Sequence, residues 1–167
     1  MNDKTPDSHL ATAAQIKAEP EVPIAHPLNP NSEVYLRRLS VKVGLQREQV
    51  YLSRIPAGKE SFAYHAHKGD EEWLFILSGR GRAVIGDKTF EVGPGDFMGF
   101  PTPSIGHHLM NPYDEDLVYL MGGERGRTDI VAFPKVGKVG LFSADGIYFV
   151  DDDKLEPTSF EAFVKKP

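Results

Sequence analysis

The sequence predicts an all-β fold: a small antiparallel β-barrel with an N-terminal arm and a short C-terminal helix. The chain has 167 residues, which suits one domain. From Glu33 to about Phe133, short apolar or alternating runs are separated at near-regular intervals by turns rich in Gly, Pro and Asp. Many short strands joined by tight turns are typical of a sandwich or barrel and not of a βαβ fold.

We expect three parts along the chain: an arm over residues 1–32, the barrel over 33–133, and an extension over 134–167 that packs on the barrel. In the arm, HLATAAQIKA predicts one short helix, and the prolines that follow favour extended backbone. In the extension, IYFV favours a strand, and Thr158 and Glu161 stand at capping-box spacing for a last short helix.

The barrel strands are expected in order as VYLRRLSVKV, VYLSRI, SFAYHAH, EWLFILSG, GRAVIG, TFEV, DFMGF, HHLMN, LVYLMGG and DIVAF. Gly79 and Gly81 flank Arg80 in a tight turn that favours positive φ. In EWLFILSG both faces are apolar, because side chains alternate along a strand. Cover for the second face must come from another sheet, the arm or a second subunit. We therefore expect a homodimer, in which the arm or first strand could pair with the neighbouring sheet. The alternative is that the arm packs on its own barrel.

Composition excludes several classes of protein. The net charge is −5 and no run of Lys or Arg stands out, so no nucleic-acid partner is expected. Cysteine is absent, which excludes disulfides and thiolate metal ligands. The start, MNDKTPDSHLATAAQ, lacks the apolar core of a secretory signal, and no apolar run approaches the ~18 residues of a membrane span. We therefore expect a cytoplasmic protein with no membrane partner.

The histidines are concentrated in two short segments about forty residues apart. His65 and His67 share one face of a strand, and the four-residue turn KGDE follows them. If the next strand pairs antiparallel across that turn, Glu72 lies beside His67. Two imidazoles and a carboxylate would then meet at a point that suits a divalent metal. The alternative is that both are ordinary strand residues beside a solvated acidic turn.

The second segment is GPGDFMGFPTPSIGHHLMN, in which a Gly-Asp turn opens an apolar strand and a proline-rich bend precedes His107 and His108. Neighbouring residues on a strand face opposite sides, so at most one of these two points inward with the first cluster.

Together the two segments resemble the two motifs of the cupin superfamily. The first motif, G(x)5HxH(x)3–4E(x)6G, is matched with one extra residue in its first gap. The second motif, G(x)5PxG(x)2H(x)3N, is matched with PTPSIG in place of PxG and one extra residue before the histidine. The matching residues are Gly58, His65, His67, Glu72 and Gly79, and then Gly95, Pro101, His107 and Asn111.

The resemblance implies a jelly-roll barrel, also called a double-stranded β-helix, with His65, His67, Glu72 and His107 as metal ligands. Three nitrogens and one oxygen suit one divalent transition metal: Zn, Mn, Fe, Ni or Co. No other cofactor is expected.

Single-domain cupins similar to this chain are labelled sugar-phosphate-isomerase-like, which implies a sugar phosphate as the small-molecule substrate. The metal would bind its carbonyl and hydroxyl oxygens, and Glu60, Tyr64 or His108 would move the proton. Basic residues that could hold the phosphate are Arg54, Lys59, Lys68, Arg82, Arg125 and Arg127. The alternatives are an Fe(II)-dependent dioxygenase of a small substrate and a non-catalytic small-molecule-binding cupin; we favour the isomerase.

Overall fold

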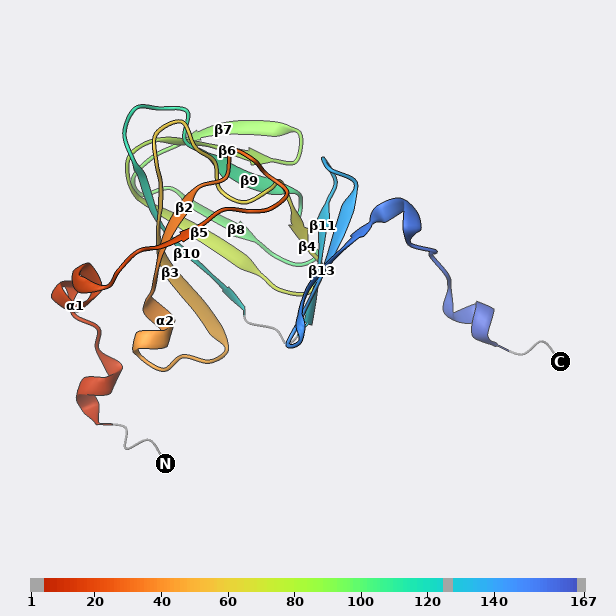
Figure 1. Cartoon of the computed structure of the whole chain (residues 1–167), viewed down its shortest axis with the longest axis horizontal. Coiled ribbons are helices and arrows are strands. Elements are labelled where there is room, and N and C mark those ends of the chain that lie inside the picture. Colours follow the sequence, from red (N-terminus) through yellow and green to blue (C-terminus); the bar gives the residue numbers. More distant parts are fainter. Residues whose placement is uncertain (1–4, 125–127, 165–167) are drawn as a thin grey trace.

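A computed structural model describes residues 5–124 and 128–164 and consists mainly of antiparallel β-strands (Figure 1). The largest sheet has six strands in the order β1-β2-β3-β10-β5-β8. Their bounds are Val22–Ile24, Val34–Arg38, Glu48–Ile55, Leu117–Glu124, Glu72–Ser78 and Phe97–Phe100.

Two smaller sheets complete the fold. A three-stranded sheet has the order β7-β6-β9, with bounds Lys88–Val92, Gly81–Ile85 and His107–Met110. A four-stranded sheet has the order β13-β12-β11-β4, with bounds Gly146–Asp151, Lys138–Ser143, Thr128–Phe133 and Ala66–His67. An isolated bridge between His65 and His107 connects the entrance of β4 to β9.

The helices are short and lie outside the sheets. They are α1 (Ala13–Ala18), α2 (Leu39–Lys42) and the 3-10 turns η1 (Pro6–His9), η2 (Asp152–Lys154) and η3 (Phe160–Phe163). None of the helices in the described part of the chain has both the length and the apolar composition needed to cross a membrane.

The core lies between the six-stranded and three-stranded sheets. Along β10 buried and half-buried residues alternate, as expected for a strand with one face inward. Val34, Ile55, Ile76, Leu117 and Tyr119 are fully buried in this core. A smaller cluster of Ala63, Val131 and Phe133 lies beneath the four-stranded sheet. The prediction of an all-β jelly roll is therefore confirmed.

The tight turn between β5 and β6 shows why glycine is needed there. Gly79 has φ of +77°, and a Cβ at this position would lie 2.2 Å from the carbonyl oxygen of Asp116. The expectation of positive φ in this turn is confirmed for Gly79, whereas Gly81 does not adopt it.

Two stretches differ from the expected strands. The run VYLRRLSVKV is not one strand, because β2 ends at Arg38, where its pairing with β3 ends, and α2 then turns the chain back towards β3. The strand β12 was not expected. It pairs with β11 on one side and with β13 on the other. Such pairing depends on neighbouring strands and is not visible in the local sequence pattern.

The arm packs on its own chain where it is closest to the sheets. The strand β1 pairs with β2 of the same chain and forms one edge of the six-stranded sheet, so the arm packs on its own body at Val22–Ile24, whereas pairing with a neighbouring subunit stays a prediction. Glu21 binds Arg54 and Arg37 through its carboxylate oxygens, at 2.7 and 3.0 Å. The predicted helix is present as α1, which Thr12 and Gln15 begin with a capping box.

The C-terminal extension is paired at its start and extends away at its end. The strand β13 pairs with β12, and Phe149 contacts Phe133 edge-on. Residues 152–164 then lead away from the sheets (Figure 1), and neither 3-10 turn there has a buried residue. The last helix is the single turn η3, whose N-cap is Ser159 and not Thr158.

Candidate metal centre

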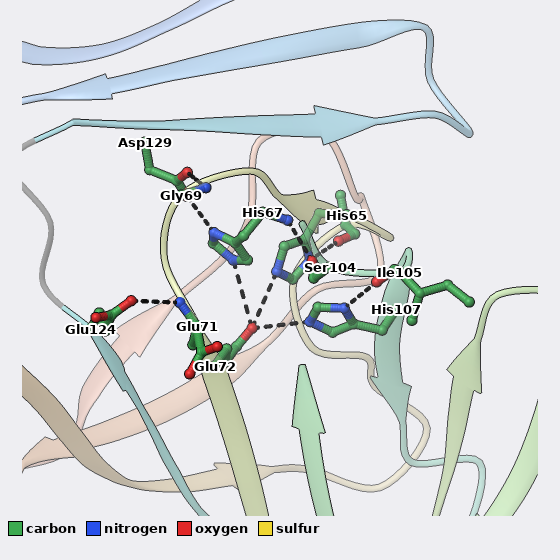
Figure 2. A network of polar contacts seen from close by, with 11 residues as sticks. His65, His67, Gly69, Glu71, Glu72, Ser104, Ile105, His107, Glu124 and Asp129 are labelled. Atoms are coloured by element: carbon green, nitrogen blue, oxygen red, sulfur yellow. Dashed lines mark hydrogen bonds and ion pairs between the residues drawn. The ribbon is translucent and has the colours of Figure 1, made fainter. Parts of the chain in front are cut away.

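Four polar side chains from three parts of the fold meet inside the jelly roll (Figure 2). His65 and His67 come from the entrance and end of β4, Glu72 begins β5, and His107 begins β9. The Oε2 atom of Glu72 lies 3.0 Å from Nε2 of His107, 3.5 Å from that of His65 and 3.6 Å from that of His67. The ligand atoms of His65, His67 and Glu72 all lie within 4.8 Å of one another.

The residues converge by a different route from the expected hairpin. The strand β4 pairs with β11, with His67 opposite Val131, and β5 pairs with β10 and β8. Glu72 is therefore not a cross-strand neighbour of His67, and that expectation is wrong. The turn KGDE instead carries the chain from the four-stranded sheet to the six-stranded sheet, and the side chains meet across the gap between the sheets.

Each imidazole is held by its far nitrogen. The Nδ1 atoms of His65 and His107 lie 2.8 Å from the carbonyl oxygens of Ala63 and Ile105. The Nδ1 atom of His67 lies 2.5 Å from Oδ2 of Asp129. These oxygens only accept hydrogen bonds, so each Nδ1 carries a proton and each Nε2 is directed towards Glu72. Three imidazoles and one carboxylate without thiolate fit a divalent transition metal, to which each Nε2 would offer its lone pair once it has lost its proton.

Asp129 is a buried residue of the centre that the sequence interpretation missed. Its other oxygen, Oδ1, accepts hydrogen bonds from the backbone N–H groups of Gly69 and Ile130, both at 2.8 Å. It shares the inward face of β11 with Val131 and Phe133. In the run DIVAF, Asp129 occupies a position that alternates with the apolar residues Val131 and Phe133. This position could have indicated a functional carboxylate, because unpaired carboxylates are rarely buried.

Neighbouring groups fix the orientation of the rings. The ring of Phe100 stacks on that of His107, with centroids 3.6 Å apart and planes 3° from parallel. The Ser104 hydroxyl accepts a hydrogen bond from the backbone N–H of His67 at 2.7 Å. The proline-rich bend before β9 therefore supports two of the three imidazoles.

Burial and charge act against each other in the cluster. Burial raises the pKa of Glu72, but hydrogen bonds from His107 and His65 outweigh it and hold the pKa well below its usual value. Burial lowers the pKa of His65, but the hydrogen bond and charge of Glu72 raise it above its usual value. The carboxylate is therefore ionised, as a metal ligand must be.

The three acid–base candidates lie around the other face of β9. His108 points away from His107, and its ring lies edge-on to Tyr64 at a centroid distance of 6.0 Å. Burial lowers the pKa of His108 to about 4. The Tyr64 hydroxyl donates to the carbonyl oxygen of Gly86 at 3.0 Å. Glu60 accepts hydrogen bonds from two asparagines of the arm, at 3.0 and 3.2 Å.

Three of the four basic candidates among the described residues are already paired. Arg54 binds Glu21 and Asp116, and the other two pairs are Lys59 with Glu33 and Arg82 with Glu91. Lys68 is exposed and directly follows His67. Arg125 and Arg127 lie outside the described residues.

A cavity of about 20 Å³ lies inside the barrel beside the cluster. That is room for about one water molecule. His65, Glu72 and His107 line it together with mainly apolar residues, among them Met98 and Met121.

The fold and the site define a class: a jelly-roll protein with a cluster of three histidines and one carboxylate between its sheets. The cupin domain family matches residues 51–123. No curated protein matches the chain.

Solved structures extend the match to nearly the whole chain. A protein of Acidithiobacillus ferrooxidans, provisionally described as a sugar phosphate isomerase, is 31% identical; the similarity covers 92% of this chain and 98% of that one, with a TM-score of 0.88. A sugar phosphate isomerase of the cupin superfamily from Silicibacter pomeroyi is 24% identical over 86% and 93% of the chains, with a TM-score of 0.76. The chain belongs to the cupin superfamily.

The same fold is shared with a protein of other chemistry. The polyketide cyclase RemF from Streptomyces resistomycificus has a TM-score of 0.58 at 18% identity, over 69% of this chain and 80% of that one. The fold therefore does not fix the reaction, which has to be argued from the site.

Proposed function

We propose that this cupin is a metal-dependent enzyme that isomerises a sugar phosphate. One observation carries the proposal: three imidazole Nε2 atoms converge on Glu72 while each Nδ1 is held by an oxygen acceptor. A polar cluster that served only to stabilise the fold would not need three imidazoles whose Nε2 atoms all point at one carboxylate.

The proposed ligands of one divalent ion are His65, His67, Glu72 and His107. The ion would be Zn, Mn, Fe, Ni or Co, because these metals accept imidazole and carboxylate ligands. When bound, such an ion polarises a carbonyl oxygen of the substrate. The contribution of the chain is to hold the four ligands rigidly and to surround them with apolar side chains that exclude water.

Support for the substrate class comes from the provisional description of the relative from Acidithiobacillus ferrooxidans as a sugar phosphate isomerase. No Lys or Arg lines the interior cavity, so the phosphate would stay outside it. Lys68 is exposed and adjacent to His67, and it is our candidate for holding the phosphate.

The group that moves the proton stays a prediction. Glu60, Tyr64 and His108 remain the candidates from sequence, but their contacts lie with the arm, with Gly86 and with one another. A catalytic base must come within hydrogen-bond reach of the proton that it abstracts. Of the three, His108 alone lines the interior cavity, so a role for Glu60 or Tyr64 requires a movement when substrate binds.

To test the proposal, the protein is loaded with each candidate metal in turn. Each loaded sample is then incubated with a panel of hexose and pentose phosphates, and NMR follows their interconversion. We expect one aldose–ketose pair to interconvert with loaded wild type and not with His67→Ala. Absence of interconversion across the whole panel contradicts the isomerase proposal.

A dioxygenase is the second candidate, and the small apolar cavity favours it, because a diatomic molecule fits in a space of about 20 Å³. Oxygen uptake by the Fe(II)-loaded protein would distinguish it, since isomerisation proceeds without oxygen. A ligand that binds and stays unchanged would indicate the third candidate, a binding protein. The cytoplasmic location stays a prediction.

We also propose a homodimer through the outer face of the six-stranded sheet. Leu52, Leu120, Phe75 and Phe97 are directly paired in a row across β3, β10, β5 and β8. Phe97 is 64% exposed, and Trp73 stacks on it. An apolar row across four strands is suited to a second copy of the same face, because the two-fold contact is self-complementary.

A further inference from the structure

Two buried hydroxyl groups face the interior without a partner. Ser53 on β3 and Tyr119 on β10 are directly paired across the two strands, and both are fully buried. Within the described residues, neither the Ser53 Oγ nor the Tyr119 hydroxyl has a hydrogen-bond partner. They lie on the opposite face of the sheet from the row that contains Leu52 and Leu120.

Such groups are uncommon and costly. A buried polar atom that loses water without gaining a partner destabilises the fold, and most buried polar atoms in proteins are paired. Phenylalanine and alanine would fill the same positions without that cost. The retained hydroxyls therefore point to a partner that the chain does not itself supply.

The position of Tyr119 indicates what the partner touches. Tyr119 lines the same cavity as His65, Glu72 and His107, so the cavity connects the hydroxyl region with the proposed metal ligands. Burial, and then the charge of Glu72, raise the pKa of Tyr119 well above its usual range, and the nearby Ser53 hydroxyl lowers it by less, without reaching hydrogen-bond geometry. Tyr119 therefore keeps its proton and is available as a donor.

We propose that the Tyr119 hydroxyl, beside that of Ser53, forms the inner end of the ligand site and hydrogen-bonds an uncharged hydroxyl of the small molecule held at the metal centre. A water molecule takes that place when no ligand is bound, since the cavity has room for about one. This inference rests on the proposed function, because it needs a ligand at the four-residue cluster.

The lining of the cavity also sets the orientation of the ligand. No Lys or Arg lines it, and Glu72 is negatively charged, so an anionic group inside would be desolvated without a counter-charge. A sugar phosphate would therefore enter with its polyol end inward and its phosphate outward. Met98 and Met121 are flexible side chains that can move aside for carbon atoms of the ligand.

The test uses two neutral probes that differ by one hydroxyl: dihydroxyacetone and hydroxyacetone. Each is titrated into the cobalt-loaded full-length protein, and binding is followed by the visible absorption of the cobalt ion. We expect Tyr119→Phe to weaken dihydroxyacetone about 5- to 10-fold, the usual worth of one hydrogen bond, and to leave hydroxyacetone unchanged. Ser53→Ala should show the same selectivity with a smaller loss.

Two controls keep the outcomes distinct. Cobalt affinity should be equal in wild type and Tyr119→Phe, and the melting temperature without ligand should stay close to that of wild type, because no hydrogen bond within the protein is lost. Equal weakening of both probes, or of neither, overturns the inference. Cobalt uptake with no response to either probe also overturns it while leaving the metal centre intact. Failure to take up cobalt instead contradicts the proposed function.

Discussion

At the scale of single residues, the centre depends on what holds the far side of each imidazole. Two of the three acceptors are backbone carbonyls, which no substitution removes. The third is the Asp129 carboxylate, which accepts from His67 and from two backbone N–H groups. Asp129 is therefore the side chain whose hydrogen bond orients a proposed ligand and which can be replaced while the ligand itself is kept.

We expect Asp129→Asn to weaken metal binding about 10- to 100-fold, because residues that orient a ligating histidine usually contribute that much. The amide can still accept through its oxygen, but it does not carry the negative charge that makes the imidazole more basic. Competition with a chromophoric chelator would measure the affinity of the apo-protein for Zn and Co.

Asp152→Asn is the matched control, since this residue lies in η2, away from the cluster. Circular dichroism should show both variants folded. Equal affinity of Asp129→Asn and wild type would remove Asp129 from the centre.

Residue spacing could predict part of this centre and no more. The HxH pattern, Glu72 and His107 have recognisable spacing along the chain. Asp129 is 62 positions from His67, and its contact depends on β11 pairing with β4, a long-range contact that local pattern does not encode. Adjacent histidines could be assigned to opposite faces from strand alternation alone, but which of them faces inward depends on the register of β9 with β6.

At the scale of elements, a half-buried histidine, His26, holds the arm against the body of the protein. His26 contacts the rings of Phe133, Phe62 and Phe149, and its Nδ1 accepts a hydrogen bond from the backbone N–H of Leu28 at 3.2 Å. Burial lowers the pKa of His26 from 6.5 to about 4. The neutral ring is therefore part of the packed arm.

This pKa predicts how stability depends on pH. Between pH 6.5 and 4 the unfolded chain binds a proton at His26 and the folded chain does not, so stability falls as the pH falls through this window. We expect a loss of about 1 to 2 kcal/mol after allowance for partial exposure. Urea unfolding of the apo-protein at pH 7 and pH 4.5 would measure it.

His26→Gln should reduce that pH dependence, and His9→Gln, in the exposed turn η1, should not. An unchanged pH dependence in His26→Gln would show that the histidine does not titrate with folding.

The order of strands was easier to predict than their partners. Turn residues such as Gly79 divide the chain correctly, because positive φ is a local requirement. The KGDE turn was mistaken for a hairpin, since the sequence of a turn does not state whether the chain stays in one sheet. The α2 turn was missed because Leu39–Lys42 carries the same apolar alternation as the strand before it.

At the scale of the whole molecule, several apolar surfaces are exposed among the described residues, and two of them are compared as sites of a contact between subunits. One is the sheet row that contains Phe75 and Phe97, and the other is the C-terminal segment that contains Phe160 and Phe163. The sheet row is continuous with four paired strands, whereas the segment extends away from them (Figure 1). The sheet row is therefore the better surface for a stable two-fold contact.

We predict that light scattering after size exclusion gives twice the mass of one chain for wild type and the mass of one chain for Phe97→Asp, because a charge in a buried apolar contact is not compensated. Phe160→Asp is the matched control and should stay dimeric, since Phe160 is even more exposed but lies in the segment. Dissociation by Phe160→Asp alone would assign the interface to the segment instead.

The central claim is the metal centre, and metal content per chain tests it most directly. Metal content would be measured by plasma mass spectrometry on untagged wild type and on three variants. His67→Ala and His107→Ala each remove a proposed ligand. His108→Ala is the control, because His108 is the neighbour of His107 that faces the other side of β9. The account predicts about one metal ion per chain in wild type and in His108→Ala, and its loss in the other two variants. Wild type that holds no metal even after reconstitution, or metal that depends on His108 and not on His107, would contradict it.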